Sequence, residues 1–359
     1  MSVVVLGAGI IGLAAAYELT EKGYQVEIIA NYFPQDPSTL AKKDYSYYYT
    51  SPWAGAHYRP FPNVQPWDAR ESDYTRVTLK KFHEFAQIFY KTSVKFIEGV
   101  EWFEDEKPHY KRVGKGYSEG IPNFRRLNNA ELPKDVSLGF KYETWSLTPP
   151  IFLWWLLQTL EARGVKFTVR TVDSVKEVYS LYPNCIGVVN CSGRGVTLDG
   201  SIDEFSTPIR GQTLLINPPP NHPYQNQTIT HQDEKGIFTF IIPRPLTGTI
   251  IVGGTKQLGD TYDKPREADT QGLIAKASKL FPGLMKLNPK TGKKEFEILK
   301  VNVGFRPARS IGSRVELEKV GSKFLVHAYG VGGMGYEVSF GIAAKVVELV
   351  ETGSRVRKL

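Results

Sequence analysis

The sequence has little cysteine and no long apolar run. Cys185 and Cys191 are the only cysteines among 359 residues, and neither has a neighbouring histidine or basic motif that would activate its thiol. This excludes a disulfide framework or a cysteine-rich metal site and is typical of a protein from a reducing compartment. No segment approaches the roughly 18 apolar residues that a membrane-spanning helix needs, and the first apolar stretch contains Glu18 and Glu21. We therefore expect neither a membrane anchor nor an N-terminal secretion signal.

Charge of one sign is not concentrated anywhere in the chain. The sequence has 45 Lys and Arg against 37 Asp and Glu, a formal net charge of +8, but the basic residues are scattered and form no long run. We therefore expect no nucleic-acid binding, only a mild attraction for anionic small molecules. The 41% hydrophobic and 23% charged residues are ordinary for a globular protein and exclude a disordered or fibrous chain. The length is sufficient for two domains.

Residues 3–12 read VVVLGAGIIG, an apolar strand that ends at three glycines. Gly7 permits the tight turn out of the strand, and Gly9 lets the backbone come close to a pyrophosphate. Gly12 lets the following helix pack closely on the sheet. The phosphates of a dinucleotide would lie at the N-terminus of that helix.

The context that this motif requires is present in the sequence. A helix is predicted over residues 10–21, with Ile10 and Ile11 at its start beside the dinucleotide, and a second strand over residues 24–30. The acidic residue that usually follows the second strand, where it accepts from an adenosine ribose, is replaced by Asn31. An amide can also accept from a hydroxyl, so Asn31 alone does not separate FAD, NAD and NADP.

A second approach to the same dinucleotide is expected far from the N-terminus. A helix is predicted over residues 151–163, with strands over 165–169 and 186–190. The second of these strands runs directly into a Gly-rich turn. We expect Val172, Ser192 and Gly193, which follow the two strands, to contact the cofactor.

Alternating strand patterns occur in a separate part of the chain and predict an antiparallel sheet. They cover residues 212–216, 237–242, 249–252 and 295–303. The last part of the chain repeats the pattern of the N-terminus, a strand followed by a Gly-rich loop and a helix. The strand is predicted over 324–328 and the helix over 341–351. No internal repeat or low-complexity tract is present.

Four segments together resemble the FAD-dependent D-amino-acid oxidase and D-aspartate oxidase family. They are residues 7–12, residues 50–57 (TSPWAGAH), residues 304–309 (GFRPAR) and residues 325–341. The second has the form typical of yeast and fungal members. The last fits the family signature at every fixed position, including Gly335, Gly341 and Ala343. The resemblance covers nearly the whole chain, in order.

The resemblance implies FAD as the cofactor and an α/β fold. The Rossmann-like FAD-binding domain would comprise residues 1–58, 141–204 and 301–359. It would be interleaved with an α+β substrate domain, residues 59–140 and 205–300, built on the antiparallel sheet. In the segments 50–57 and 325–341, backbone or small side chains would approach the flavin. Their cofactor-binding residues would be Thr50, Ser51, Trp53, Ala54, Gly55, Gly330, Gly332, Gly333, Met334, Gly335 and Tyr336.

Arg306 is the main candidate for binding substrate. It lies between Gly304 and Pro307 near a strand end, where a rigid backbone can hold a guanidinium against a carboxylate in two parallel hydrogen bonds. In the family, the matching arginine holds the substrate α-carboxylate and the carbonyl matching Gly333 accepts from the amine. Arg309, Arg314 and His327 are expected in ordinary ion pairs or packing instead, so none of these three is counted in the site.

The substrate end departs from the family at three positions. Phe240 stands where relatives often carry a tyrosine near the carboxylate, so that hydroxyl is missing unless another tyrosine, such as Tyr224, supplies it. His57 stands where many relatives have a neutral polar residue, and it either adds positive charge with Arg59 or caps the loop. Lys256 stands where D-aspartate oxidases carry an arginine for the side-chain carboxylate, and it either acts as a point charge or is a solvated surface residue.

The resemblance implies an oxidase that converts D-amino acids and oxygen to 2-oxo acids, ammonia and hydrogen peroxide. FAD would supply the chemistry, so we expect no catalytic side chain and no metal. Lys256 slightly favours D-aspartate and D-glutamate as substrates. A broad or neutral D-amino-acid oxidase, a glycine- or sarcosine-type amine oxidase and a non-catalytic flavin-binding scaffold remain alternatives.

The last three residues, Arg357-Lys358-Leu359, resemble the Ser-Lys-Leu address that the peroxisomal import receptor reads. An oxidase that releases hydrogen peroxide has reason to reside beside catalase. We therefore expect a peroxisomal location with that receptor as a partner. The oligomeric state stays open, a homodimer included.

Overall fold

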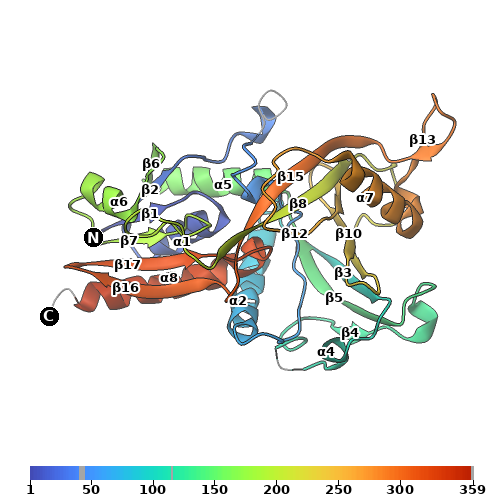
Figure 1. Cartoon of the computed structure of the whole chain (residues 1–359), viewed down its shortest axis with the longest axis horizontal. Coiled ribbons are helices and arrows are strands. Elements are labelled where there is room, and N and C mark those ends of the chain that lie inside the picture. The colour runs from blue at the N-terminus through green and yellow to red at the C-terminus, as the bar shows by residue number, and fades with distance from the viewer. Residues whose placement is uncertain (40–44, 115, 357–359) are drawn as a thin grey trace.

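The computed structural model describes residues 1–39, 45–114 and 116–356. A six-stranded sheet lies in the left half of Figure 1. Its strands are β1 (Ser2–Leu6), β2 (Gln25–Ala30), β6 (Lys166–Val169), β7 (Gly187–Asn190), β16 (Arg314–Val320) and β17 (Lys323–Tyr329). They run in the order β16-β17-β7-β1-β2-β6. Every neighbouring pair is parallel except β16 and β17.

Helices cover both faces of this sheet because the side chains of β1 alternate between two apolar clusters. Val3 and Val5 pack in a large core with α1 (Ile10–Glu21), α5 (Pro149–Ala162) and α8 (Gly335–Val356). Val4 and Leu6 pack on the opposite face with Val175 and Val178 of α6 (Val175–Leu181). This arrangement is the predicted Rossmann-like α/β unit.

The turn from β1 into α1 needs glycine at two positions. Gly7 has φ +106°, a conformation that residues with a side chain rarely adopt. A Cβ atom on Gly12 would overlap the carbonyl oxygen of Gly7. The helix can therefore begin directly behind the strand, and its N-terminus points at the space beyond the sheet edge.

The second sheet has nine strands and lies in the right half of Figure 1. Its strands are β3 (Lys95–Phe103), β4 (Arg125–Arg126), β5 (Leu138–Ser146), β8 (Ser206–Ile216), β9 (Gln227–Gln232), β10 (Phe238–Pro243), β11 (Ile250–Gly253), β12 (Gln257–Leu258) and β15 (Ile298–Arg309). The order is β12-β8-β11-β10-β9-β3-β5-β4, with β15 also paired to β8. Only β3 and β9 are parallel, so the predicted antiparallel sheet is confirmed apart from this pair.

The remaining elements complete the two layers. Leu273 and Ala277 of α7 (Glu267–Leu280) pack against the second sheet in an apolar core. The other helices are α2 (Asp68–Ala86), α3 (Phe89–Thr92) and α4 (Pro108–Lys111), and a small hairpin joins β13 (Lys286–Leu287) to β14 (Lys294–Glu295). Short 3-10 turns occupy Pro37–Thr39, Ser51–Trp53, Asn129–Glu131 and Pro282–Leu284. No helix of the described ranges has the length and apolarity to cross a bilayer.

The last helix is longer than predicted. The sequence pattern placed it at residues 341–351, whereas α8 runs from Gly335 to Val356. Gly335 lies in its first turn, and Gly341 follows six residues later. Because glycine has a low helix propensity, the sequence pattern favoured a loop where the helix begins. Gly341 is needed because a Cβ atom there would overlap the backbone of Tyr74 in α2. The two helices thus pack closely.

Two strands cross the predicted domain boundaries. β5 begins at Leu138 and lies in the second sheet, although residues from 141 were assigned to the cofactor domain. β15 extends to Arg309 in the same sheet, although residues from 301 were assigned likewise. Leu79, Phe82 and Phe85 of α2 pack in the core of the first sheet. Only the exact boundaries are affected, and the division into two domains stays a prediction.

Candidate active site

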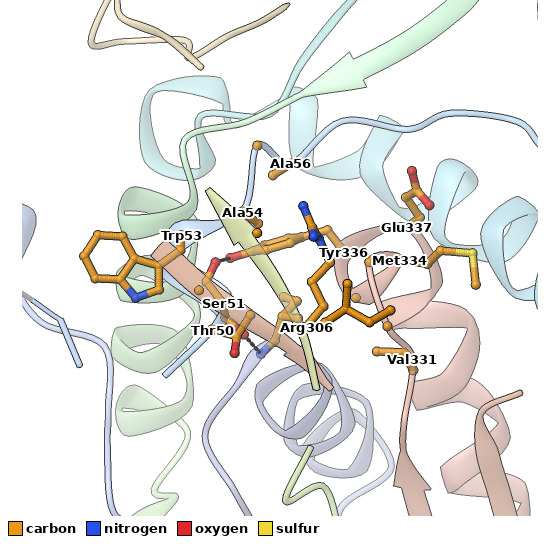
Figure 2. A pocket seen from close by; sticks show the side chains of 18 of the residues that line it. Thr50, Ser51, Trp53, Ala54, Ala56, Arg306, Val331, Met334, Tyr336 and Glu337 are labelled. Atoms are coloured by element: carbon orange, nitrogen blue, oxygen red, sulfur yellow. Dashed lines mark hydrogen bonds between the residues drawn. The ribbon is translucent and has the colours of Figure 1, made fainter. Parts of the chain in front are cut away.

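A cavity of about 490 Å³ connects the N-terminus of α1 with the inner end of the second sheet. This volume lies in the ordinary range for small-molecule sites. Four stretches form most of its wall, and Figure 2 labels side chains from the last three of them. They are Gly9–Ile11, residues 50–57 of the loop that contains Ser51–Trp53, the β15 residues 302–307, and the loop 329–337 that enters α8.

The α1 end of the cavity suits the phosphates of a dinucleotide. Gly9, Ile10 and Ile11 line it, and the first turn of α1 contains no acidic residue that would repel an anion. The Ile10 N–H donates to Ser51 Oγ at 3.0 Å, which ties the loop of Ser51 to the helix. The Tyr49 hydroxyl donates to the Ala8 carbonyl at 2.7 Å. The residues present therefore fit an extended dinucleotide with its phosphates at α1.

The loop 50–57 is fixed by hydrogen bonds to its neighbours. Thr50 Oγ1 donates to the Phe305 carbonyl at 2.6 Å, and the Tyr336 hydroxyl donates to the Ser51 carbonyl at 3.0 Å. The loop therefore offers mainly backbone and small side chains to the cavity, as predicted for Ala54 and Gly55. The indole of Trp53 points away in Figure 2, where its Nε1 donates to the Ser46 carbonyl.

The Gly-rich loop before α8 forms the opposite wall. Gly330 and Gly332 have positive φ angles of +79° and +59°. The Gly332 N–H donates to the Pro307 carbonyl at 2.8 Å and the Gly330 N–H to the Gly193 carbonyl at 3.0 Å. The loop thus joins β15 to the Gly-rich turn that follows β7. All predicted residues of this segment, from Gly330 to Tyr336, line the cavity.

Arg306 presents to the cavity a positive charge that no carboxylate of residues 1–39, 45–114 or 116–356 neutralises. Its side chain is largely buried, and burial lowers the pKa of the guanidinium. Its Nη1 donates to the Thr255 carbonyl at 3.1 Å, but no carboxylate of the described residues pairs with it. A Cβ atom on Gly211 would lie 2.6 Å from both terminal nitrogens, so that glycine makes room for the fork. The arrangement suits a ligand carboxylate.

The walls beside Arg306 are backbone on one side and aromatic on the other. A Cβ atom on Gly333 would lie 3.5 Å from Arg306 Cδ, so the Gly333 backbone runs along the arginine side chain. Phe238 and Phe240 of β10 both line the cavity. Tyr224 does not replace the missing hydroxyl, because its ring packs against Phe281 in the core of the second sheet. The prediction of Tyr224 as an alternative donor is wrong.

His57 is at the predicted place but does not carry charge. Its Nδ1 lies 3.0 Å from Thr228 Oγ1, and it lines the cavity. Burial, together with the nearby positive charge of Arg59, lowers the pKa of His57 to about 3. The hypothesis that His57 adds positive charge to the pocket is therefore wrong. The neutral ring holds the loop to β9.

Arg59 contributes its charge to a pair inside the protein. Its Nε donates to Glu101 Oε1 at 2.8 Å, and the Glu101 side chain is fully buried. The guanidinium also lies over the Phe238 ring at 4.6 Å from its centre. The backbone N–H of Arg59 donates to Glu337 Oε1 at 3.1 Å. Arg59 thus lines the cavity as part of a compensated cluster.

Glu337 was missed by the sequence prediction. It lies in the first turn of α8 and lines the cavity, as Figure 2 shows. Burial raises the pKa of this carboxyl to about 8, with Arg59 opposing and Glu101 adding to the shift. An acidic residue in the first turn of a helix is ordinary in sequence, so only its neighbour, the family's Gly-rich loop, pointed to this position.

Lys256 stands at the exposed rim of the cavity, and the described residues give it no hydrogen bond or ion pair. It directly follows Thr255, whose carbonyl accepts from Arg306. The positively charged Arg244, which follows β10, does not line the cavity. It lies behind the loop, where its Nη2 donates to the Ala54 carbonyl at 3.0 Å.

Several predicted cofactor residues lie outside the cavity wall. Gly7 and Gly12 act through the backbone turn described above. Asn31 is exposed after β2, Val172 packs in the core on the α6 face, and Ser192 Oγ donates to Asn190 Oδ1 at 2.7 Å. The cavity wall therefore gives no support to these three, and their contacts with the cofactor stay predictions.

The residues expected outside the site are indeed in ordinary interactions. Arg309 pairs with Asp203 at 3.0 Å, Arg314 pairs with Glu316, and His327 is buried 3.0 Å from Glu318. Asp203 also accepts from the Tyr329 hydroxyl at 2.7 Å, so this network supports the loop before α8. Within the described residues, no group of three or more His, Cys, Asp and Glu is placed to hold a metal ion.

Solved structures share this fold. A glycine oxidase from Geobacillus kaustophilus aligns over 98% of this chain and 94% of its own, with a TM-score of 0.70 and 15% identity. An L-α-glycerophosphate oxidase from Mycoplasma pneumoniae with FAD bound aligns over 98% and 95%, with a TM-score of 0.71 and 16% identity. At such identities these matches show the fold alone.

Sequence comparison is more specific. A D-aspartate oxidase from Talaromyces thermophilus is 36% identical, over 97% of this chain and 94% of its own. A D-amino-acid oxidase from Schizosaccharomyces pombe is 31% identical, over 97% and 95%. The family model described as FAD dependent oxidoreductase, named DAO, matches residues 2–349. The predicted resemblance is thereby confirmed, and the chain belongs to the DAO family of FAD-dependent oxidoreductases.

Proposed function

We propose that this protein oxidises D-amino acids with FAD and molecular oxygen, giving a 2-oxo acid, ammonia and hydrogen peroxide. The observation that carries the proposal is Arg306: a largely buried guanidinium, with no carboxylate partner in the described chain, faces a cavity that leads to the phosphate-binding end of α1. Relatives named D-aspartate oxidase and D-amino-acid oxidase support it.

The residues of the chain would act by orientation. Arg306 holds the substrate α-carboxylate in two charge-assisted hydrogen bonds, and the Gly333 carbonyl accepts from the amine. The side chains of Phe238, Phe240 and Ile242 form an apolar wall that keeps water from the reacting carbon. FAD, when bound, would supply the redox chemistry as the acceptor of the hydride from the α-carbon.

The charge distribution supports a lean towards D-aspartate and D-glutamate. Of the basic residues near the cavity, His57 is neutral, Arg59 is paired with Glu101, and Arg244 lies outside the cavity wall. Lys256 lines the cavity next to the residue that contacts Arg306, so it can meet a second carboxylate. The alternative, a neutral D-amino-acid oxidase, is favoured by the apolar wall of Phe238 and Phe240.

The location in peroxisomes is proposed from Arg357-Lys358-Leu359 alone. These residues lie outside the described ranges. The homodimer likewise stays a prediction.

Replacing Arg306 tests the proposed anchor. Arg306→Leu should lower kcat/KM for D-aspartate on the order of a hundredfold or more, because it removes a bidentate charge-assisted pair. The FAD content, read from the visible absorbance of the purified protein, should stay normal. Arg125→Leu, which breaks an exposed ion pair with Glu131 away from the cavity, is the matched control. Near-normal activity of a folded Arg306→Leu variant would remove this residue from the site.

Replacing Lys256 tests the proposed preference for acidic substrates. Lys256→Leu should lower kcat/KM for D-aspartate and D-glutamate and spare or raise it for D-alanine and D-methionine, because an ammonium helps a carboxylate and only costs desolvation beside an apolar side chain. Peroxide release from each substrate is the measurement. An equal change for all four substrates would make Lys256 a surface residue and favour the neutral D-amino-acid alternative.

The cofactor site is tested at Gly9. Gly9→Val should yield a colourless protein, because the side chain occupies the space beside the N-terminus of α1 that the pyrophosphate needs. Gly272→Val is the control, since a Cβ atom at Gly272 of α7 meets nothing within 4 Å. A Gly9→Val protein that keeps its full FAD would show that this turn does not contact the phosphates.

Deleting residues 357–359 tests the location. The truncated protein should move from peroxisomes to cytosol with its specific activity unchanged, because α8 extends to Val356 and the three residues follow it. Fluorescence microscopy of tagged chains, with the tag at the N-terminus, is the measurement. Peroxisomal fluorescence of the truncated chain would refute the targeting proposal.

A further inference from the structure

The carboxyl of Glu337 is held in place by one oxygen and leaves the other available. Its Oε1 accepts the backbone N–H of Arg59 at 3.1 Å. Its Oε2 has no hydrogen-bond partner in the described part of the chain, and the residue lines the cavity that contains Arg306. The Glu337 side chain is half-buried, so this second oxygen is open to the cavity and can meet a ligand there.

The position of Glu337 places the carboxyl near the expected substrate amine. Glu337 follows Gly333 by four residues, and side chains on a helix lean towards its N-terminus. The carboxyl therefore lies over the turn that contains Gly333. Arg306 would hold the substrate carboxylate beside this same turn, since the Gly333 backbone runs along its side chain. The amine, one carbon away, would lie within reach of Glu337.

The amino acid enters as an ammonium, yet it must have a lone pair on nitrogen before a hydride can leave the α-carbon. We propose that Glu337 takes this proton from the substrate α-ammonium, an inference that rests on the proposed D-amino-acid oxidation. In this step one N–H bond of the ammonium breaks and an O–H bond forms on Oε2. The electron pair stays on nitrogen, and the proton later passes to solvent. No oxidant or reductant takes part.

The charges around Glu337 suit this task. The groups that face it are Arg59, Glu101 of β3 and Tyr58. The guanidinium of Arg59 is paired with Glu101 at 2.8 Å, so it only partly offsets the effect of burial, and the pKa of Glu337 is raised to about 8. An ordinary carboxyl is far too acidic to take a proton from an ammonium, whereas one that titrates near 8 can do so at small cost.

The first experiment measures binding without turnover. Benzoate has a carboxylate for Arg306 but no amine, so it should bind only beside a protonated Glu337. In the FAD-loaded enzyme, titrated through the flavin absorbance, the Kd for benzoate should be constant below about pH 7 and rise up to tenfold per pH unit above about pH 8. Glu337→Gln should keep a low Kd within about twofold across this range.

The second experiment measures flavin bleaching by D-aspartate without air. Glu337→Gln should slow the bleaching on the order of a hundredfold at pH 8. The wild-type rate should fall below pH 8, whereas the variant should become faster up to the higher pH at which the substrate amine loses its proton unaided. Glu348→Gln, which changes an exposed carboxylate of α8, is the matched control and should match the wild type in both experiments.

Two outcomes would overturn the proposal. One is a Kd for benzoate that rises equally in wild type and Glu337→Gln, together with unchanged pH dependence of bleaching. The other needs no variant: a wild-type Kd that stays constant from pH 6 to about 9.5. A wild-type enzyme whose benzoate binding titrates as expected, but whose flavin no D-amino acid bleaches, would instead refute the proposed function.

Discussion

The strand β15 is the constraint on which the site depends, because its backbone is bonded on both sides. Along one edge it pairs with β8 from Ile298 to Arg309. At its end the Pro307 carbonyl accepts from Gly332, and Ala308 bridges Val331 in the loop before α8. The strand therefore carries Arg306 from the second sheet to the cofactor loops of the first. A shift in its register would move the arginine by a residue to the other face.

The guanidinium of Arg306 on this strand is buried and has no carboxylate partner among the described residues. Removing a guanidinium from water without a counter-ion is costly, and the Thr255 carbonyl offsets only part of that cost. Pairing with a ligand carboxylate recovers the interaction in surroundings of low dielectric constant, where it is strong. The unpaired charge of Arg306 therefore destabilises the empty site and also makes it select ligands with a carboxylate. The Arg306 side chain fits at this position because Gly211 and Gly333 leave room on both sides of it.

Local patterns predicted the parts of the fold that depend on local physics. The strand, glycine turn and helix at the N-terminus follow from period and backbone freedom, and they match the structure within a residue. The four predicted strands of the second domain are present too. The start of α8 was missed because its glycines favour a loop locally, and the close approach of Tyr74 that requires Gly341 is visible only in three dimensions.

The parts of the site that sequence could not predict depend on distant partners. The neutrality of His57 results from burial and from Arg59, and the pairing of Arg59 depends on Glu101, which lies on β3. Family motifs located Arg306 and Gly333, and they pointed to the loop before Glu337 without assigning a role to this residue. The expectation of no catalytic side chain came from the flavin's own chemistry, which needs no base for hydride transfer. Hydride transfer still requires the substrate ammonium to lose a proton beforehand.

These partners also decide the charge pattern that a ligand meets. Five acidic or basic side chains (Glu, His, Lys or Arg) of the described residues line the cavity, and of these His57 is neutral while Arg59 is compensated by Glu101. Arg306, Lys256 and Glu337 remain, two cations and one carboxyl. An acidic D-amino acid carries two carboxylates, one for each of these cations, whereas a neutral one leaves Lys256 without a counterpart. Electrostatic complementarity of this kind acts mainly on specificity. The lean towards acidic substrates therefore follows from the whole set of charges around the cavity, and Lys256 contributes to it as one member of that set.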